Sequence, residues 1–191
     1  MKIHLIRHGE TMATEKKLYY GKTDLPLTAS GVEGIALLRK QGIYPEGGIF
    51  FTSGLLRAEQ TFNIIYGNMR RRVIPLIAEL NVGEFEMKSY DELKDRADYQ
   101  AWITDETGDV ACPGGESVNQ FRSRIMEGYN RIISEVRESM SAIAVCHGGV
   151  IALIMEHLYP GEKNFYEWVP ETGRGYTIAY DSDGLHEYEP I

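Results

Sequence analysis

The chain has 191 residues, of which 43% are hydrophobic, so it can bury one sizeable core, and we expect a single domain over residues 1–191. Lys and Arg number 20 against 28 Asp and Glu, and the resulting formal net charge of −8 argues against nucleic acid or an anionic membrane as the main partner. The two cysteines, Cys112 and Cys146, lie far apart in the sequence, which predicts free thiols. The sequence shows no secretory signal and no apolar run of membrane-spanning length, so we expect a cytoplasmic protein.

The first predicted strand leads directly into a polar tip. Residues 2–6 form a short apolar run typical of a buried strand, and Arg7, His8 and Gly9 follow it. Ligands of open α/β sheets bind beyond the carboxyl ends of the strands, so this tip can form an anion pocket. A lone Arg-His-Gly is more often a simple polar turn, and the assignment therefore depends on partners elsewhere. Residues 11–22 lack a regular period and predict a loop folded over the pocket.

Helix and strand signals alternate along the rest of the chain. Thr28 is a good N-cap for a helix whose inward stripe includes Val32 and Ile35. Ser53 can cap the helix that follows it or bond to the pocket, and we favour the cap. The predicted elements after the helix at Thr28 are a strand at 49–52, a helix at 55–66, an edge strand at 72–76, an acidic loop at 79–86, a short helical region at 90–102, a loop at 107–116, a helix from 117 to about 138, a strand at 142–146, a helix at 150–158, and a hairpin of strands 176–180 and 185–188 around a turn at 181–184.

This alternation predicts an α/β fold, a three-layer α/β/α domain with a mostly parallel central sheet. The C-terminal hairpin would add antiparallel strands, so we expect a mixed sheet.

Two apolar strands end in His-Gly, at His8 and at His147. If these strands are neighbours in one sheet, both imidazoles converge on one point. Arg7 joins them from the first strand end and Arg57 from a third strand-to-helix turn, and the backbone N–H groups after Gly148 complete the surroundings of an anion. A phosphoryl group is the natural occupant, because each guanidinium can hold two of its oxygens.

These residues belong to six short sequence blocks that follow one another along the chain. They are Arg7-His8-Gly9-Glu10-Thr11, Thr23-Asp24-Leu25-Pro26-Leu27-Thr28, Ser53-Gly54-Leu55-Leu56-Arg57-Ala58-Glu59-Gln60-Thr61, Glu79-Leu80-Asn81-Val82-Gly83-Glu84-Phe85-Glu86, Pro113-Gly114-Gly115-Glu116-Ser117 and Cys146-His147-Gly148-Gly149. In these blocks the chain resembles the histidine phosphatase superfamily, also called phosphoglycerate mutase-like proteins. The resemblance covers nearly all of the chain before the C-terminal tail and implies the phosphoglycerate mutase-like fold.

The resemblance implies a role for each pocket residue. His8 corresponds to the nucleophile that forms a phosphohistidine, and a neutral imidazole suits this chemistry because it splits one hard displacement into two easier ones. Arg7, Arg57 and His147 correspond to residues that bind phosphate and stabilise the transition state. Glu79 lies where the family carries its proton donor, although a loop carboxylate taken alone is more often simply solvated.

The chain departs from the family pattern at two positions that we include among the substrate-binding candidates. Thr14 stands where the family commonly has an Asn phosphate ligand, and it offers less reach. Tyr20 precedes the loop glycine, Gly21, where many phosphatase members have Gln. Tyr20 could stack on a substrate ring or pack within the loop, and we favour packing.

The leading hypothesis is a metal-independent phosphatase, without cofactor, that acts on a small phosphorylated metabolite. Mutase members of the family generally carry an added segment after the acid block, and the span from Glu86 to Pro113 is short here, so phosphoglycerate mutase is the second candidate. A catalytically weak phospholigand-binding regulatory protein is the third, motivated by Thr14 and Tyr20. A ribazole phosphate, a sugar phosphate and a phosphoglycerate all stay open as substrates, and so does the oligomeric state.

Other reactive side chains receive structural roles. His4 should point away from the surroundings of His8, and Cys146 ends an apolar run as an inert buried thiol. Metal binding lacks support, because no histidine pair has helix-face spacing. The aromatic tail around Tyr166 and Trp168 could line the substrate mouth, which nothing in the sequence requires.

Overall fold

A mixed sheet forms the centre of the protein. The structure is a computed structural model that describes residues 1–136, 140–181, 184 and 186–191. Within these residues the sheet has six strands in the order β3-β2-β4-β1-β5-β6. The strands are β1 (Lys2–Arg7), β2 (Ile49–Thr52), β3 (Arg71–Val73), β4 (Ser141–Cys146), β5 (Gly175–Tyr180) and β6 (His186–Pro190).

The pairing of the strands confirms the predicted sheet. β1 to β4 are mutually parallel, whereas β5 pairs antiparallel with both β1 and β6. β1 lies directly beside β4, and Arg7 stands opposite Cys146 in the register. Both strands therefore end at the same edge of the sheet, as the His-Gly pattern requires.

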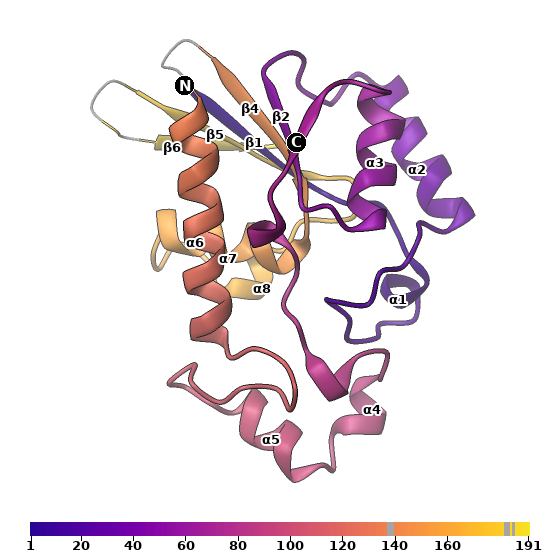
Figure 1. Cartoon of the computed structure of the whole chain (residues 1–191), viewed down its shortest axis with the longest axis vertical. Coiled ribbons are helices and arrows are strands. Elements are labelled where there is room, and N and C mark those ends of the chain that lie inside the picture. Colours follow the sequence, from indigo (N-terminus) through magenta and orange to yellow (C-terminus); the bar gives the residue numbers. More distant parts are fainter. Residues whose placement is uncertain (137–139, 182–183, 185) are drawn as a thin grey trace.

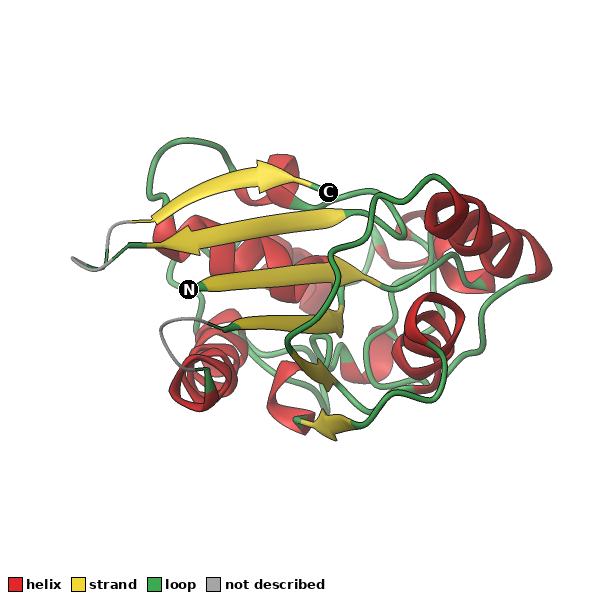
Figure 2. Ribbon diagram, turned by 90° about the horizontal axis from the view of Figure 1, so that it is seen from above, coloured by secondary structure: helices red, strands yellow, loops and turns green. Residues whose placement is uncertain are grey.

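Helices cover both faces of the sheet, which confirms the three-layer prediction (Figure 1). The helices are α1 (Met12–Glu15), α2 (Ala29–Lys40), α3 (Leu56–Tyr66), α4 (Tyr90–Leu93), α5 (Ala97–Ile103), α6 (Val118–Glu135), α7 (Gly148–Leu158) and α8 (Phe165–Trp168), with short 3-10 turns η1 (Pro75–Ile77) and η2 (Gly83–Phe85). α2 and α3 lie on one face, and α6, α7 and α8 lie on the other (Figure 2). None of the helices in the described ranges is long and apolar enough to cross a membrane.

Side chains of the central strands alternate between the two faces of the sheet and so contribute to both halves of the core. Ile3 and Leu5 pack with α6 and α7, whereas Ile6 packs with α2 and α3. Successive side chains of a strand point to opposite faces, so apolar residues on both faces, as in residues 142–146 of β4, predict cover on both sides. This burial removes the middle of β1 and β4 from solvent, whereas Lys2 and Ser141 at their amino ends stay exposed or partly exposed.

The structure corrects several predicted boundaries. Val32 is exposed, because α2 turns Gly31 and Ile35 toward the sheet and only Ile35 of the predicted pair lies inside. β3 ends at Val73, since Pro75 begins a 3-10 turn and cannot donate to a strand ladder. Two short helices were not predicted as such: α1 within the loop at 11–22, and α8.

The C-terminal ends of two predicted segments lie partly outside the described residues. α6 is described to Glu135, and the predicted end near residue 138 falls outside the described part. The turn at 181–184 and the start of its second strand at 185 include undescribed positions too, although β5 and β6 confirm the hairpin itself.

Candidate active site

The carboxyl ends of β1 and β4 bring two buried histidines together. The ring centroids of His8 and His147 lie 5.2 Å apart, and both side chains are almost completely shielded from solvent. His8 follows β1 directly, and His147 is the N-cap residue of α7. The convergence expected from the two His-Gly motifs is therefore present in the fold.

One hydrogen bond defines the tautomer of His8. Its Nδ1 lies 2.7 Å from the carbonyl oxygen of Gly9, which can only accept, so Nδ1 carries the proton and Nε2 carries the lone pair. Burial, together with the nearby guanidinium groups of Arg57 and Arg7, lowers the pKa of His8 well below its usual value. The ring is therefore neutral at pH 7, with Nε2 available as a nucleophile.

Arg57 lies on α3 and places a buried guanidinium group in the pocket. Its side chain is fully buried, and its Nη1 and Nη2 donate to the carbonyl oxygens of Thr23 and Gly21 at 3.0 and 2.8 Å. Its Nε donates to Nδ1 of His147 at 3.3 Å. These acceptors are uncharged, so the guanidinium keeps its positive charge for a further, anionic partner.

His147 holds the opposite tautomer to His8. Because its Nδ1 accepts from Arg57, its Nε2 donates to the hydroxyl of Ser53 at 2.8 Å. The preferred interpretation of Ser53 as a helix cap is wrong, since α3 begins after Leu55 and has no side-chain cap. Ser53 instead orients His147, which is the alternative that the sequence left open.

Arg7 has an unused donor in the pocket. Its Nη1 donates to the carbonyl oxygen of Pro170 at 2.6 Å, whereas its buried Nε has no hydrogen-bond partner among the described residues. A Cβ at Gly148 would stand 3.1 Å from this Nε, so the glycine leaves room beside it. A buried unpaired N–H is costly, and its presence here is typical of a binding site without its ligand.

Glu79 lies at the start of α7, beside His147. Its carboxylate accepts from the backbone N–H groups of Gly149 and Leu80, both at 3.0 Å. A Cβ at Gly149 would approach Glu79 to 2.5 Å, so any other residue there would require the carboxylate to shift. The acidic loop is thus brought to the edge of the sheet where the two histidines lie.

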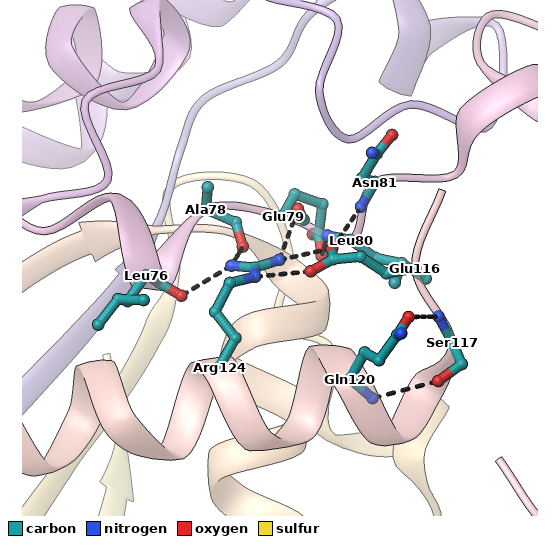
Figure 3. A network of polar contacts seen from close by, with 9 residues as sticks. All are labelled: Leu76, Ala78, Glu79, Leu80, Asn81, Glu116, Ser117, Gln120 and Arg124. Carbon is teal, nitrogen blue, oxygen red and sulfur yellow. Dashed lines mark hydrogen bonds and ion pairs between the residues drawn. The ribbon is translucent and has the colours of Figure 1, made fainter. Parts of the chain in front are cut away.

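A polar network holds the backbone around Glu79 in place (Figure 3). Arg124, on α6, donates to the carbonyl oxygens of Leu76, Ala78 and Glu79. The same guanidinium forms a two-pronged ion pair with Glu116, at 2.8 Å for each contact. Sequence reasoning missed Arg124, because nothing in its helical surroundings indicates that it binds three carbonyl groups about 45 residues earlier in the chain.

Tyr20 enters the pocket from the loop above it. Its hydroxyl lies 3.4 Å from Nε2 of His8 and accepts from Oγ1 of Thr11 at 3.1 Å. The guanidinium of Arg57 stacks over its ring at 4.7 Å. Burial raises the pKa of Tyr20, so the phenol stays protonated. The preferred packing role is therefore incomplete, because the hydroxyl points at the nucleophilic nitrogen.

The two other loop candidates have internal contacts. The Thr14 hydroxyl forms the capping box of α1 with Thr11, at 2.6 and 2.7 Å from its backbone, and it lines a cavity together with Arg7 and Tyr20. The N–H of Gly21 donates to Glu86, and a Cβ there would overlap the carbonyl group of Leu80. Whether either residue contacts a substrate stays a prediction.

Glu86 is a pocket-forming residue that the sequence analysis did not single out. Its carboxylate accepts from the backbone N–H groups of Gly21, Lys22 and Thr23 at 2.9 to 3.1 Å, and from the Thr23 hydroxyl at 2.6 Å. The carbonyl groups of this segment hold Arg57. Glu86 therefore positions Arg57 indirectly, through a loop more than 60 residues away.

The order and spacing of these residues match a known family. A model of the histidine phosphatase superfamily (branch 1) matches residues 3–186. The chain belongs to this superfamily. The match includes both strand ends, Arg57 and the Glu79 loop, and it confirms the resemblance and the phosphoglycerate mutase-like fold.

Relatives within the histidine phosphatase superfamily carry two different names. The chain is 30% identical to the adenosylcobalamin/alpha-ribazole phosphatase of Escherichia coli K12, over 83% of this chain and 79% of the relative. It is 32% identical to the 2,3-bisphosphoglycerate-dependent phosphoglycerate mutase of Xanthobacter autotrophicus, over 79% and 78%. Among solved structures, the alpha-ribazole phosphatase from Shigella flexneri is similar with a TM-score of 0.86 and 26% identity, covering 100% of this chain and 96% of that one. The phosphoglycerate mutase from Thermus thermophilus has a TM-score of 0.72 and 29% identity, covering 98% and 96%.

Proposed function

We propose that this chain is a metal-independent phosphatase that hydrolyses a small phosphomonoester through a phosphohistidine on His8. The state of His8 is the observation that carries the proposal. Its Nε2 carries the lone pair at neutral pH, near the guanidinium groups of Arg57 and Arg7, and the Tyr20 hydroxyl is the group in contact with it, at 3.4 Å. A nucleophile flanked by two guanidinium groups suits attack on a dianionic phosphoryl group.

In the first step, Nε2 of His8 attacks phosphorus, the N–P bond forms and the bond to the ester oxygen breaks. Arg7, Arg57 and His147 bind the equatorial oxygens, where charge accumulates during transfer. Glu79 donates its proton to the leaving alkoxide. In the second step water attacks the phosphohistidine, Glu79 takes up a proton from that water, and phosphate leaves with His8 restored.

Glu79 suits the proton-donor role better than the other nearby carboxylate. Glu10 lines the cavity beside Arg7, but its carboxylate accepts hydrogen bonds from the hydroxyls of Ser30 and Thr28. Glu79 instead lies against α7 beside His147 and lines a different cavity, on the α7 side. A leaving group bound in this second cavity would therefore lie beside the Glu79 carboxyl group.

The relatives support hydrolysis over mutase activity. The similarity to the alpha-ribazole phosphatase structure is higher, at a TM-score of 0.86, than to the phosphoglycerate mutase structure, at 0.72. Chain length does not separate the two, since the chain covers 78% of a mutase relative. We therefore keep a ribazole-type phosphomonoester as one candidate substrate, and mutase activity as the alternative.

The regulatory alternative would keep the pocket without turnover. Tyr20 motivates it, because its hydroxyl faces the atom of His8 that must attack. Against it, both histidines and both arginines of the pocket are in place. Tight vanadate binding without any phosphohistidine would favour this alternative.

Three other predictions belong with this proposal. A single domain is supported by the pairing of β1, near the N-terminus, with β5, near the C-terminus. A cytoplasmic location is supported by Cys112 and Cys146, which are both buried free thiols. A surface with net negative charge supports a small phosphorylated molecule, rather than nucleic acid, as the partner.

The decisive experiment replaces the nucleophile. We expect His8→Ala to lower phosphate release from p-nitrophenyl phosphate by about 10³-fold or more, because Nδ1 of His147, the other described imidazole of the pocket, already accepts from Arg57. Acid-labile label from ³²P-substrate should appear on the peptide that contains His8 in the wild type only. His4→Gln, in the same strand but outside the pocket, is the control and should retain turnover.

Full residual activity of His8→Ala would contradict the proposal. Incubation with 3-phosphoglycerate separates the two enzyme classes: a phosphatase releases phosphate, whereas a mutase forms 2-phosphoglycerate.

A further inference from the structure

The polar cavity beside Arg7 reaches the histidine pocket from the side of the loop after β1. It has a volume of about 410 Å³, and Arg7 and Tyr20 are part of its lining. The hydroxyl of Tyr20 lies 3.4 Å from Nε2 of His8, and the buried Nε of Arg7 has no hydrogen-bond partner among the described residues. The cavity therefore leads to the groups that would bind a phosphoryl group in the proposed function.

Two cations and one carboxylate line this cavity, namely Arg7, Lys17 and Glu10. Arg7 is half-buried, whereas Lys17 is exposed and lies on the solvent side of the lining. The carboxylate of Glu10 accepts from the hydroxyls of Thr28 and Ser30. None of the ion pairs between described residues includes Lys17. Its ammonium group is therefore available to an anion that arrives from solvent.

Lys17 occupies a backbone position that favours glycine. Its φ is 53°, and Met87 is the other non-glycine residue with a positive φ in the part of the chain that the structure describes. At the end of α1 the N–H of Leu18 bonds to the carbonyl oxygen of Ala13 at 2.9 Å. The N–H of Lys17 bonds to that of Thr14 at 3.3 Å. This is the Schellman pattern, whose left-handed residue is usually glycine because a Cβ is unfavourable there.

The end of α1 does not by itself explain a lysine at this position. A positive side chain near a helix C-terminus stabilises the last carbonyl groups, but α1 has only four residues, and Lys16, its C-cap, already supplies such a charge. Residues held in a strained backbone conformation are found preferentially at functional sites. The strain at Lys17 therefore points to a role for its side chain in the cavity.

The overall charge of the chain provides a reason for a cation at this place. A phosphomonoester is largely a dianion at neutral pH, and the formal net charge of −8 repels it as it approaches. A cation on the wall of a cavity reverses the potential locally, because low-dielectric walls concentrate its field. Arg7 lies deeper in the same cavity and can bind the dianion next.

We propose that Lys17 captures the substrate. Its ammonium group attracts the phosphoryl dianion into the cavity, and Arg7 then binds it beside His8. The proposal rests on the proposed function, which supplies the phosphomonoester and the place where it reacts. It adds a residue outside the histidine pocket that governs how readily the substrate is captured and does not act in the chemical step.

The test removes the same charge from two neighbouring residues. With p-nitrophenyl phosphate at an ionic strength of about 10 mM, Lys17→Gln should lower kcat/KM by about three- to tenfold and leave kcat within about twofold of the wild type. The difference should nearly vanish at an ionic strength of about 500 mM, where charges are screened over a few ångströms. Lys16→Gln is the control, because Lys16 lies outside the cavity lining, and it should change kcat/KM by less than about twofold.

Two further variants separate the charge of Lys17 from its backbone conformation. Lys17→Arg keeps the positive charge and should retain the wild-type kcat/KM. Lys17→Gly lacks the charge, as Lys17→Gln does, but relieves the left-handed strain. It should therefore have the low kcat/KM of Lys17→Gln and yet unfold at a higher urea concentration than that variant.

The outcomes separate this proposal from the proposed function. Wild-type kcat/KM in Lys17→Gln, an equal loss in Lys16→Gln, or a loss that persists in full at high ionic strength would overturn capture by Lys17 and leave the phosphatase intact. Lower stability of Lys17→Gly than of Lys17→Gln would contradict the strain argument and overturn the proposal in that respect. Failure of the folded wild type to hydrolyse p-nitrophenyl phosphate would overturn the proposed function, and the role of Lys17 with it.

Discussion

At the scale of single residues, the chemistry depends on which nitrogen of each histidine carries the proton. His8 and His147 share a pocket but hold opposite tautomers, since one donates from Nδ1 to a carbonyl group and the other accepts there from Arg57. Only His8 therefore presents a free lone pair on Nε2, apart from the long contact to Tyr20. This difference explains why two similar His-Gly motifs serve different roles in the proposed reaction.

Glu79 provides the residue-scale prediction. Glu79→Gln should lower kcat for n-butyl phosphate by about 10²- to 10³-fold, because an alkoxide needs a proton to leave. The loss for p-nitrophenyl phosphate should be much smaller, since that phenolate leaves without protonation. Steady-state kinetics with both esters measure the difference.

Glu10→Gln is the matched control for this prediction, because Glu10 is the other carboxylate of the pocket region and is already engaged with Ser30 and Thr28. It should leave the ratio of the two rates unchanged. An equal loss for both esters in Glu79→Gln would argue that Glu79 only shapes the pocket.

At the scale of elements, the pocket is assembled by segments that hold one another. The Glu86 carboxylate binds the N–H groups of residues 21–23, and the carbonyl groups of Gly21 and Thr23 in turn hold Arg57. Arg124 does the same for the segment before Glu79 (Figure 3). The catalytic candidates are thus positioned by charged groups that bind the backbone around them.

Glu86→Gln tests this arrangement. An amide keeps one acceptor but places an NH₂ group against backbone donors, so we expect a loss of about 1–3 kcal/mol in unfolding free energy. The value of kcat/KM for p-nitrophenyl phosphate should fall as well, because Arg57 loses its support. Urea unfolding and steady-state kinetics measure the two effects.

Glu84→Gln is the control for Glu86→Gln. Glu84 lies in η2, the 3-10 turn that Glu86 follows, and its side chain is 65% exposed and pairs with Arg96 at 3.4 Å. Exposed pairs of this kind contribute little, so stability and activity should remain near wild-type values. Wild-type stability of Glu86→Gln would contradict the proposed bracing.

At the scale of the whole molecule, buried neutral histidines make the fold sensitive to acid. The pKa values of His4, His8 and His147 are all lowered, in each case chiefly by burial. The unfolded chain binds protons near pH 6.5, whereas the native protein does so only at lower pH. Stability therefore falls as the pH drops below about 6.5.

His4 permits a quantitative prediction, since its pKa is lowered to about 4 and it lies outside the pocket, bonded to Thr177 at 2.9 Å. Between pH 7.5 and 4.5 the wild type should lose roughly 2–3 kcal/mol more unfolding free energy than His4→Gln. Above pH 7 the contribution vanishes, because both states are then neutral. Urea unfolding at the two pH values measures the difference.

Thr177→Val is the control for the acid prediction. It removes the hydrogen bond but keeps His4 buried, and burial is the larger cause of the lowered pKa. The loss on acidification should therefore persist in this variant. Equal losses in the wild type and in His4→Gln would contradict the linkage.

Local patterns in the sequence were sufficient to predict the main strands and helices and the two histidines at the centre of the site. Apolar runs predicted β1, β2 and β4, and cap residues such as Thr28 and Ser117 predicted helix starts, because both signals depend on residues close together in the chain. The two His-Gly strand ends predicted the convergence of His8 and His147, since parallel neighbours must end at the same edge.

Contacts between distant segments were decided only by the tertiary structure. Ser53 bonds to His147, Tyr20 reaches His8, and Glu86 holds a loop more than 60 residues away. Each of these side chains has an equally good local role, as a cap, a packed ring or a solvated acid. No periodicity or spacing chooses between the local and the distant partner, because that choice depends on which backbones the folded sheet brings together. The apolar cavity lined by Tyr19, Trp102 and Tyr166 arises in the same way, because the loop after β1 and the helices α5 to α8 form its walls together.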